Sequence, residues 1–457
     1  MIELMPVIMF IVICLVLMAG FPVALSLGGT AIIFAVIGIQ MGIFEEIILR
    51  ALPSRIFGIM NNDNLIAVPL FIFMGVMLER AKIAEQMLSS MAYLFGRVSG
   101  GLAYSVILVG MLMAASTGIV GATVVTMGLL SLPVMLKHGY DKAMSCGIIC
   151  ASGTLGQIIP PSIVLVLLGD VLSSAYQQAQ AAAGVYPPKA ISIGDLFMGA
   201  LIPGLILVIF YIIYVAIRIR LRPQDAPLPE TQSIAKVSWQ TMTFSLAVPL
   251  LLITAVLGSI ISGLATPSEA ASVGAMGALI IAALQRQLDW ARLKEVMQST
   301  TKTSSMVFLI LIGASIFSLV FRGYGGDDLI MALFEHLPGG PLGAMLVVMF
   351  VMFLLGFILD FIEIVYVVVP IVAPVLLMMG LDPIWLGVMI AINLQTSFHT
   401  QPLGFSQYYM RGVAPDAIKT TQIYRGVIPF IFIQLGLLIF LALFPTITNW
   451  LPNIIYR

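Results

Sequence analysis

One apolar segment interrupted by glycine and proline occurs twice in this chain. Residues 133–161 and 374–402 align at a constant offset of 241 without a gap. The alignment pairs prolines, glycines and aspartates, including Pro133 with Pro374 and Asp141 with Asp382. Glycine and proline interrupt helices, and their recurrence at one spacing indicates an internal duplication. The chain is therefore expected to fold as two related halves, each with a break in an apolar helix.

The composition places both halves in a membrane. Hydrophobic residues make up 60% of the chain, charged residues make up 9%, and the mean hydropathy is +1.11. Soluble domains carry about 25% charged residues, so a soluble fold is excluded. Residues 201–217 and 428–444 are nearly unbroken apolar runs of helix-spanning length, unlike the alternating strands of a membrane barrel. With a net charge of zero, nothing indicates a nucleic-acid partner.

The hydrophobic runs predict the same six elements in each half, in an all-α polytopic fold. We expect a first inverted repeat at 1–221, a cytoplasmic linker at 222–241 and a second inverted repeat at 242–457. Each repeat is expected to have three helices, a doubled segment, a broken helix and a final helix. The expected segments are 4–20, 22–41, 64–79, 101–135, 143–171 and 196–217, followed by 242–262, 266–284, 303–322, 343–379, 384–405 and 427–448.

Lysines and arginines divide unevenly between the two sides of this layout. With each doubled segment entering and leaving by one face, 16 basic residues lie on the side of the linker and 5 on the other side. The positive-inside rule then makes the linker cytoplasmic and both termini external. The halves must face opposite ways, with hairpin 101–135 entering from the cytoplasm and hairpin 343–379 from outside. Ordinary two-span hairpins would give the same distribution of basic residues between the two sides. The polar and glycine-rich tips favour re-entrant hairpins.

The two hairpin tips contain residues that are unusual at membrane depth. Residues 115–123 are rich in small and hydroxyl residues, which allow the backbone to turn where protein or a cavity satisfies its polar groups. A small-residue helix-packing face is the alternative. Residues 356–363 contain Asp360 and Glu363, and acids within a membrane are candidates for function. Snorkelling or structural pairing of these acids is the alternative.

A broken helix follows each hairpin, at residues 150–162 and 393–404. Unwound backbone carbonyls and hydroxyl or amide oxygens suit a hard cation such as Na⁺, and half-helix N-termini suit an anionic substrate. The pattern thus predicts two similar cation sites around one anion site, although a kinked helix would explain either break alone. His399 lies in the second break, as a proton-coupling group or as a hydrogen-bonded structural histidine. Arg322 is the outer arginine best placed to meet a carboxylate, or it snorkels to the interface.

Four motifs in order resemble the large membrane subunit of tripartite ATP-independent periplasmic (TRAP) transporters. They are residues 118–123, residues 153–162, Thr266-Pro267-Ser268-Glu269 and the Gly-x-Asp-Pro element at 380–383. The third also has the pattern of a helix N-terminus with an acid in its first turn. The resemblance covers essentially the whole chain. Residues 51–54 and the polar insert 173–195 are most similar to the branch for mannitol, chloroaromatic compounds and 2-oxo acids.

The resemblance implies a Na⁺-driven elevator importer of an organic acid, a carboxylate, in the bacterial inner membrane, with both termini periplasmic as the charges predict. It also implies two partners, a small four-helix membrane subunit and a soluble periplasmic substrate-binding protein. Carried over by motif, the Na⁺ ligands would be Ser116, Thr117, Gly118, Gly153, Thr154, Asp360, Asn393, Gln395, Thr396, Ser397 and Thr400. Substrate contacts would come from Thr117, Ser162, Arg322, Asp360 and Gln401.

One residue departs from the family pattern. The family usually has Thr-Pro-Pro at the second break, whereas this chain has Thr400-Gln401-Pro402. Gln401 adds a backbone donor and a polar side chain, which affects either the cation geometry or the substrate preference.

Three other functional classes compete with this interpretation. A stand-alone symporter of organic anions and Na⁺ could share the inverted-hairpin architecture, and the presence of a small membrane subunit would distinguish the two. An intramembrane hydrolase is disfavoured because the sequence has no Gly-x-Ser-Gly, Gly-x-Gly-Asp or His-Glu-x-x-His pattern. A channel is disfavoured because paired breaks around a closed site suit coupled transport better than a continuous pore. The chain is therefore not expected to be an enzyme.

Overall fold

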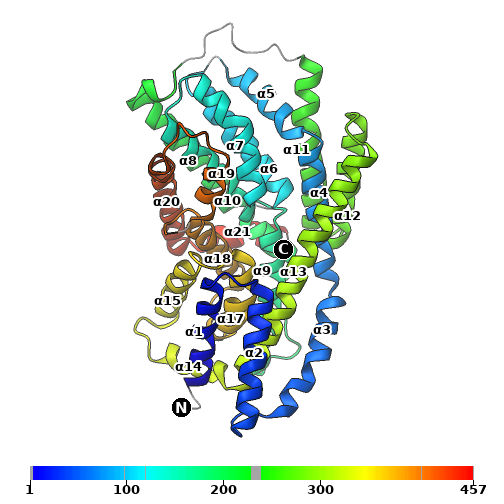
Figure 1. The fold of residues 1–457 in the computed structure, drawn as a ribbon, viewed down its shortest axis with the longest axis vertical. Helices are drawn as coiled ribbons and strands as arrows, with labels where there is room; N and C mark the ends of the chain where they lie inside the picture. The colour runs from blue at the N-terminus through cyan, green and yellow to red at the C-terminus, as the bar shows by residue number, and fades with distance from the viewer. Residues whose placement is uncertain (1–3, 97, 119, 228–237, 403, 456–457) are drawn as a thin grey trace. The chain divides into compact units, whose positions relative to one another are not determined.

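The computed structural model is all-helical throughout its described part, which comprises residues 4–96, 98–118, 120–227, 238–402 and 404–455 (Figure 1). No strand occurs in these ranges. Eight of the described helices are long and apolar enough to cross a membrane, and a bent pair of helices at Glu46–Met60 and Asp63–Arg80 gives a ninth candidate span. The prediction of an all-α polytopic membrane protein is confirmed.

Helices recur in the same order in the two halves of the chain. The first half contains α1 (Met5–Met18), α2 (Val23–Gln40), η2 (Glu46–Ala51), α3 (Leu52–Met60), η3 (Asp63–Ile66), α4 (Ala67–Arg80), α5 (Ile83–Phe95), α6 (Gly101–Thr117), α7 (Val120–Lys137), α8 (Lys142–Gly153), η4 (Leu155–Gln157), α9 (Ile163–Ala182), α10 (Ile193–Leu221) and η5 (Pro223–Asp225). The second half contains α11 (Trp239–Ile261), α12 (Pro267–Leu284), α13 (Trp290–Gly323), α14 (Gly326–Glu335), α15 (Gly340–Leu355), α16 (Phe361–Glu363), η6 (Ile364–Val368), α17 (Val369–Met378), α18 (Pro383–Ser397), α19 (Phe405–Val413), α20 (Thr420–Leu443) and α21 (Thr446–Ile455).

Two helices are longer than the hydrophobic runs suggested. α13 begins at Trp290, before the expected start at residue 303, and α9 continues to Ala182, into the insert expected at 173–195. Neither extension contains glycine or proline, so nothing stops the helix where its sequence becomes polar. Hydropathy marks the part of a helix that crosses the apolar layer, not the end of the helix itself.

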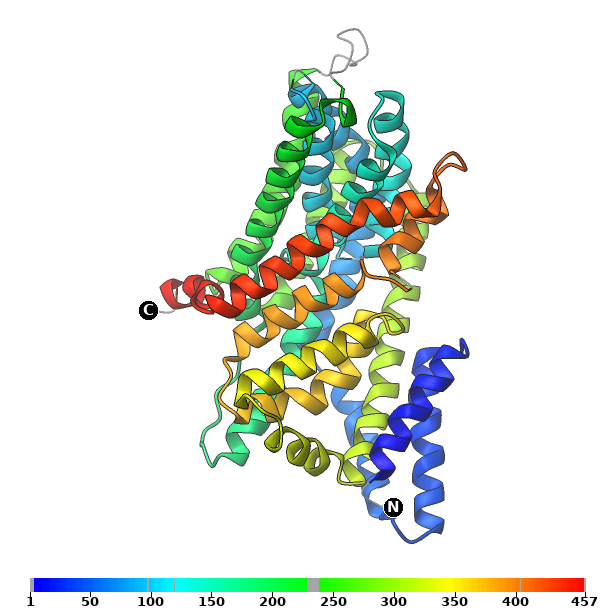
Figure 2. The same cartoon turned by 90° about the vertical axis from the view of Figure 1, so that its left-hand side faces the viewer.

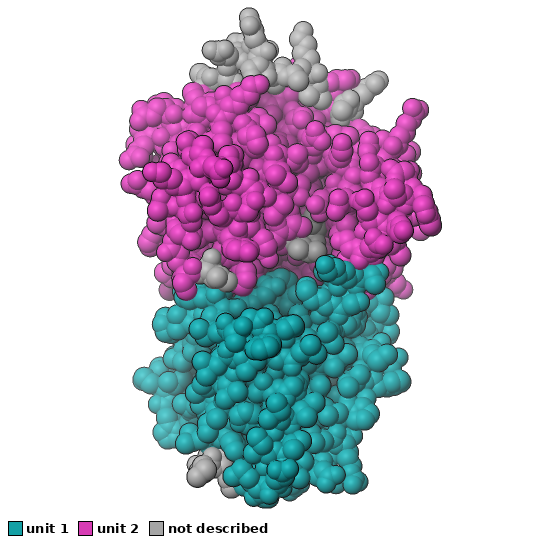
Figure 3. All heavy atoms as spheres, in the orientation of Figure 1, with its two compact units in different colours: residues 1–66, 166–192, 301–387 teal, residues 67–165, 193–300, 388–457 magenta. Residues whose placement is uncertain are grey.

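The chain forms two compact units, each built from separate stretches of sequence (Figure 3). Unit 1 comprises residues 1–66, 166–192 and 301–387, and unit 2 comprises residues 67–165, 193–300 and 388–457. Each unit therefore contains segments from both halves of the duplicated sequence. Hairpin α6/α7 and both helix breaks belong to unit 2, whereas hairpin α15/α17 belongs to unit 1.

Close helix packing in unit 2 holds the first half of the broken helix. α8 packs against α20, the long orange-red helix in Figure 2. Gly147 of α8 faces the backbone of Gly426 of α20, and a Cβ atom on Gly147 would collide with the Gly426 carbonyl oxygen. Residues without side chains allow helices to approach closely in a membrane, where hydrophobic burial cannot drive helix association.

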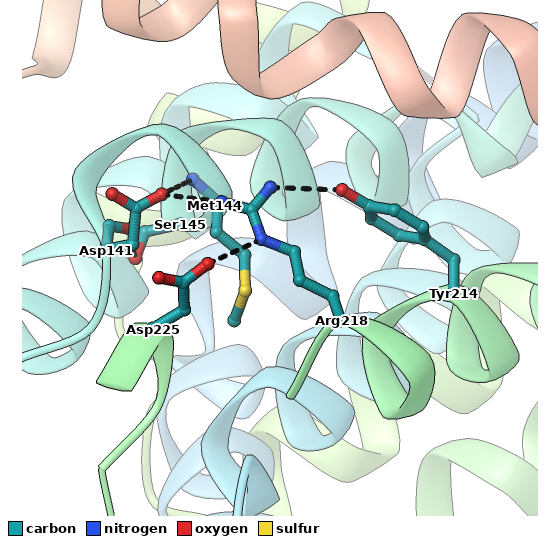
Figure 4. A network of polar contacts seen from close by, with 6 residues as sticks. All are labelled: Asp141, Met144, Ser145, Tyr214, Arg218 and Asp225. Atoms are coloured by element: carbon teal, nitrogen blue, oxygen red, sulfur yellow. Dashed lines mark hydrogen bonds and ion pairs between the residues drawn. The ribbon is translucent and has the colours of Figure 1, made fainter. Parts of the chain in front are cut away.

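A charged network holds the N-terminus of α8 (Figure 4). The Asp141 side chain caps the helix, with its Oδ1 atom accepting from Met144 N at 2.8 Å. Arg218 near the end of α10 donates from Nη2 to Asp141 Oδ1 at 3.0 Å and from Nε to Asp225 Oδ2 at 2.9 Å. Its Nη1 atom donates to Tyr214 Oη at 3.0 Å. Three helical segments of unit 2 are joined in this way beside the start of the linker.

The start of α12 matches its sequence pattern. Thr266 accepts from Glu269 N at 3.3 Å, and Glu269 Oε2 accepts from Thr266 N at 2.8 Å. This is a capping box, which satisfies two backbone donors at the helix end. The prediction of a helix N-terminus at 266–269 is confirmed.

Candidate functional site

Both broken helices stop in the middle of an apolar segment and restart several residues later. α8 ends at Gly153 and α9 begins at Ile163, while α18 ends at Ser397 and α19 begins at Phe405. The breaks contain cis peptide bonds at Pro160–Pro161 and at Gln401–Pro402, which are the same positions in the two copies. Proline lacks an N–H donor and interrupts helical hydrogen bonding. Within each break, backbone N–H and C=O groups consequently lack helical hydrogen bonds and are free to bind other groups.

The two breaks touch at equivalent positions of the repeat. Gln395 Nε2 donates a hydrogen bond to Thr154 Oγ1 at 3.2 Å, across a sequence separation of 241 residues. His399 Nε2 lies 2.8 Å from the same hydroxyl oxygen. All three side chains are fully buried. Two of the predicted Na⁺ ligands, Thr154 and Gln395, are thus brought into direct contact.

His399 links several polar groups around this contact. Its Nδ1 atom lies 2.8 Å from Ser406 Oγ at the start of α19, and its carbonyl oxygen accepts from Gln407 Nε2 at 2.6 Å. The Thr154 and Ser406 hydroxyls also reach the carbonyl oxygens of Ala151 and Phe398, each at 3.0 Å. Both ring nitrogens therefore have hydroxyl partners in a water-excluded position. His399 is therefore hydrogen-bonded through both ring nitrogens, as buried polar groups in folded proteins generally are.

Hairpin one packs closely against the first break. Gly118 ends α6 with a positive φ of 61°, and its N–H donates to Ala114 O at 3.0 Å. A Cβ atom on Gly156 would lie 2.7 Å from the same carbonyl oxygen, so only glycine fits there without backbone movement. Gly118 and Gly153 are both buried. The side chain of Thr117 and the whole of Ile119 lie outside the described residues.

Hydroxyl groups at the predicted cation positions, and at the predicted substrate contact Ser162, donate to nearby carbonyl oxygens. Ser116 donates to Met113 O at 2.8 Å, and Ser162 donates to Gln157 O at 3.1 Å. In the second break, Thr396, Ser397 and Thr400 donate to carbonyl oxygens three or four residues earlier, at 2.7–2.9 Å. A hydroxyl that has donated its proton keeps lone pairs that can accept or coordinate. Asn393 is also buried, at 4% exposure.

Asp360 begins the second arm of hairpin two, in unit 1. Its Oδ1 atom accepts from Phe361 N at 2.7 Å, and Glu363 Oε2 accepts from Asp360 N at 3.1 Å. This capping box starts α16, which continues into the π-helical segment η6. π-Helical segments often occur at functional sites. The two acids predicted from sequence are therefore joined in one structural motif at the hairpin tip.

Arg322 contacts the second arm of the same hairpin. Its Nη2 atom donates to Pro370 O at 3.1 Å, and its Nε atom lies 3.3 Å from Asp327 Oδ2. Asp360 is not among its hydrogen-bond or ion-pair partners within the described residues. Of the other predicted substrate contacts, Ser162 is buried and Gln401 is exposed, both in unit 2. The predicted substrate contacts are thus divided between the units, with Arg322 and Asp360 in unit 1 and the other two in unit 2.

Residues 10–447 match the model of the DctM component of the tripartite ATP-independent periplasmic transporter. The chain belongs to the DctM family. It is 29% identical to the C4-dicarboxylate TRAP transporter large permease protein DctM of Rhodobacter capsulatus, over 96% of this chain and 97% of that protein. It is 27% identical to the Pseudomonas aeruginosa protein of the same name, over 90% of this chain and 91% of that protein. Other relatives are named for sialic acid and ectoine.

A solved structure shares the fold of this DctM-family chain. The YdaH transporter of Alcanivorax borkumensis superimposes with a TM-score of 0.65, covering 96% of this chain and 98% of that chain at 14% identity. DctM proteins are transporter components, so the expectation that the chain is not an enzyme is confirmed.

Sequence reasoning missed three polar residues around the breaks of this DctM chain. Ser406 and Gln407 hold His399 from beyond the second break. Gln157 in the first break is fully buried, and neither its Nε2 nor its Oε1 atom has a partner among the described residues. The sequence did contain a signal for Gln157, since it is a long polar side chain within an otherwise apolar segment. No local pattern indicates Ser406 and Gln407, because their role depends on how the chain folds back after Pro402.

Proposed function

We propose that this chain is the large permease of a Na⁺-coupled importer for an organic acid. The single observation that carries the proposal is the direct contact between the two helix breaks, through Thr154 and Gln395. Broken helices that meet between inverted repeats bind substrate and coupling ions in secondary transporters. In this proposal the halves have inverted orientations in the inner membrane, with both termini periplasmic, and hairpins α6/α7 and α15/α17 are re-entrant.

Na⁺ is the proposed coupling ion because the candidate ligands are neutral oxygens with one acid. Serine and threonine hydroxyls in hairpin one and in the second break have donated their protons and keep lone pairs. The first site would use Ser116, Thr117, Gly118, Gly153 and Thr154, and the second Asp360 with Asn393, Gln395, Thr396, Ser397 and Thr400. Neutral oxygens with few charges suit a monovalent cation, whereas Ca²⁺ and Mg²⁺ sites use more carboxylates.

The proposed substrate is a carboxylate, bound by Ser162 and Gln401 together with Thr117, Asp360 and Arg322. Relatives named for C4-dicarboxylates and sialic acid support an acidic substrate. The two proposed partners are a small four-helix membrane subunit and a periplasmic substrate-binding protein, since the family is that of a tripartite transporter. Alternating access would follow an elevator movement that carries the substrate and Na⁺ together.

Reconstituted transport tests the proposal. Proteoliposomes contain the chain and its small membrane subunit, and the soluble binding protein is added outside. The transported substrate is the carboxylate that the binding protein binds most tightly in a panel of carboxylates. Uptake should require an inward Na⁺ gradient and should stop when choline replaces Na⁺. Equal uptake without the binding protein would instead establish the stand-alone symporter. Uptake that is indifferent to Na⁺ would contradict the coupling.

Asp360→Asn tests the second cation site without removing the helix cap. Asparagine caps helices about as well as aspartate, so α16 should keep its N-terminus. The variant should lose at least tenfold in apparent Na⁺ affinity while keeping its unfolding temperature in the absence of Na⁺. Asp328→Asn removes an exposed acid from the same unit and serves as the matched control. Asp360 has no place in the site if both variants transport with normal Na⁺ dependence.

A further inference from the structure

A polar pocket of about 380 Å³ lies within unit 1. Its wall contains two guanidinium groups, from Arg55 on α3 and Arg322 on α13, and the carboxylate of Asp170 on α9. Ser318 on α13 and Tyr366 on η6 also line it. The pocket thus joins three helices to the second arm of hairpin two.

Arg55 has no hydrogen bond or ion pair among the described residues, and Asp327, the partner of Arg322, attracts it only from beyond ion-pair distance. Its side chain is half-buried. Arg322 is already engaged with Asp327 and with Pro370 O. The planar guanidinium fork of Arg55 is therefore free to bind a carboxylate through two parallel hydrogen bonds.

Asp170 does not neutralise Arg55. Its Oδ1 atom accepts from Asn62 Nδ2 at 2.9 Å and from Asn64 Nδ2 at 3.4 Å, so the carboxylate is held by amide donors. Asn62 is in turn fixed, because its Oδ1 atom accepts from Asn64 N at 3.0 Å. The acid stays on one wall of the pocket as an acceptor for hydroxyl groups.

Tyr366 is a second, independent sign of a ligand. The residue is 91% buried, since its exposure is 9%, and its hydroxyl has no partner within the described structure. A buried hydroxyl without a partner is unfavourable, because it has lost its hydrogen bonds to water and gained none in the protein. The π-helical turn of η6 brings this side chain to the pocket wall, where a ligand can satisfy it.

Another pocket, of about 600 Å³ in unit 2, has the opposite charge balance. It is lined by four acids and three bases, namely Glu79, Glu85, Asp289, Glu295, Arg80, Lys82 and Arg292. The lining of the unit 1 pocket has two bases and one acid. An anion is therefore favoured in the unit 1 pocket and not in the unit 2 pocket.

From these observations we propose that the unit 1 pocket binds a small carboxylate. Arg55 holds the carboxylate, Tyr366 hydrogen-bonds to it, and Asp170 accepts from a hydroxyl group of the same molecule where it has one. The proposal rests on the proposed function, since it identifies an additional binding site for the transported acid. The charge distribution assigns Arg55 and Arg322 to the outer side, where an imported substrate arrives.

Cysteine labelling measures the charge of the pocket without any transport. Ser315 is half-buried and lines the pocket, so Ser315→Cys places a thiol inside it, in a Cys14→Ser background because Cys146 and Cys150 are buried. The purified protein is labelled with anionic MTSES or cationic MTSET. A unit charge about 8 Å from a reacting group changes the ratio of the two rates about fivefold. Arg55→Gln should lower the MTSES/MTSET ratio by about this factor, and Asp170→Asn should raise it.

The matched control is Arg50→Gln, which removes an exposed positive charge from nearby η2 without touching the pocket lining. This variant should leave the ratio within about twofold, because exposed charges are screened by salt. Equal effects of Arg50→Gln and Arg55→Gln would overturn the assignment of Arg55 to an anion site.

Protection by acids tests binding itself. Acetate, pyruvate and succinate are compared with chloride at equal ionic strength in the same reaction. At least one should slow MTSES labelling of Ser315→Cys more than chloride does, with the protection reduced at least fivefold by Tyr366→Phe. The proposal is wrong if no acid protects beyond chloride. Labelling needs neither a Na⁺ gradient nor a binding protein, so failed transport with intact protection would contradict only the proposed function.

Discussion

Replacing Thr154 with valine tests whether the contact between the two helix breaks stabilises the protein. The Thr154 hydroxyl meets His399 Nε2 at 2.8 Å and Gln395 Nε2 at 3.2 Å, and all three side chains are fully buried. Valine has nearly the same shape but no hydroxyl, so both nitrogens lose this partner in a site closed to water. Each unsatisfied group costs about 1–3 kcal/mol, which gives an expected loss of about 2–6 kcal/mol.

Equilibrium unfolding in mixed detergent micelles, followed by the fluorescence of the 4 tryptophans, measures this loss. Thr154→Ser keeps the hydroxyl and should recover most of the stability. Thr254→Val is the matched control, because the Thr254 hydroxyl is exposed and bonds only within its own helix, to Leu250 O at 2.8 Å. That control should change the free energy of unfolding by less than about 0.5 kcal/mol.

A double-mutant cycle isolates the pair across the repeat. Gln395→Leu removes the amide that Thr154→Val leaves unpaired, and removing both partners is less harmful than removing one. The double variant should therefore be more stable than the sum of the two single losses predicts, by about 1 kcal/mol. Additive losses, or a Thr154→Val loss no larger than that of Thr254→Val, would refute the conclusion that the breaks are held together here.

Three further changes have expected outcomes in the same unfolding assay. Gly156→Ala should cost at least about 2 kcal/mol, because the new Cβ would lie 2.7 Å from a backbone oxygen, whereas Gly436→Ala has free space and should stabilise the helix slightly. Arg218→Met should cost about 2–3 kcal/mol by leaving two half-buried carboxylates without a cation, and a loss unchanged by the salt concentration would argue against the ion pairs. Tyr211→Phe should cost about 1–3 kcal/mol, since it removes the hydroxyl that Gln434 Nε2 contacts at 2.8 Å, and an unchanged stability would contradict that role.

The duplicated breaks could be predicted from sequence because their causes are local. Glycine and proline interrupt a helix wherever they occur in an apolar run, so the ends of α8 and α18 follow from residues within a few positions of them. The capping box at Thr266 is equally local, since its two partners are three residues apart. Helix ends in polar sequence were less predictable, as the early start of α13 at Trp290 demonstrates.

The candidate site was only partly accessible to the same reasoning. Thr154 and Gln395 were both selected as cation ligands, but nothing in the sequence indicated that they contact each other. Asp360 was selected as an intramembrane acid, and its role as the N-cap of α16 became clear only from the geometry of the hairpin tip. The anchoring of His399 by Ser406 and Gln407 depends on a chain reversal after the second break.

By itself, the amino-acid sequence determined the membrane class, the duplication, the two helix breaks and the family motifs. These properties depend on composition and on short-range constraints of the backbone, which act within a few residues and do not depend on how the helices pack. Tertiary structure decided which polar atoms meet, including Thr154 with Gln395 and Arg322 with Pro370. Within the described part of the chain, it also brought Arg55 and the Tyr366 hydroxyl to one pocket without a hydrogen-bond partner for either. Contacts between residues hundreds of positions apart depend on how helices pack, and no local pattern encodes that packing.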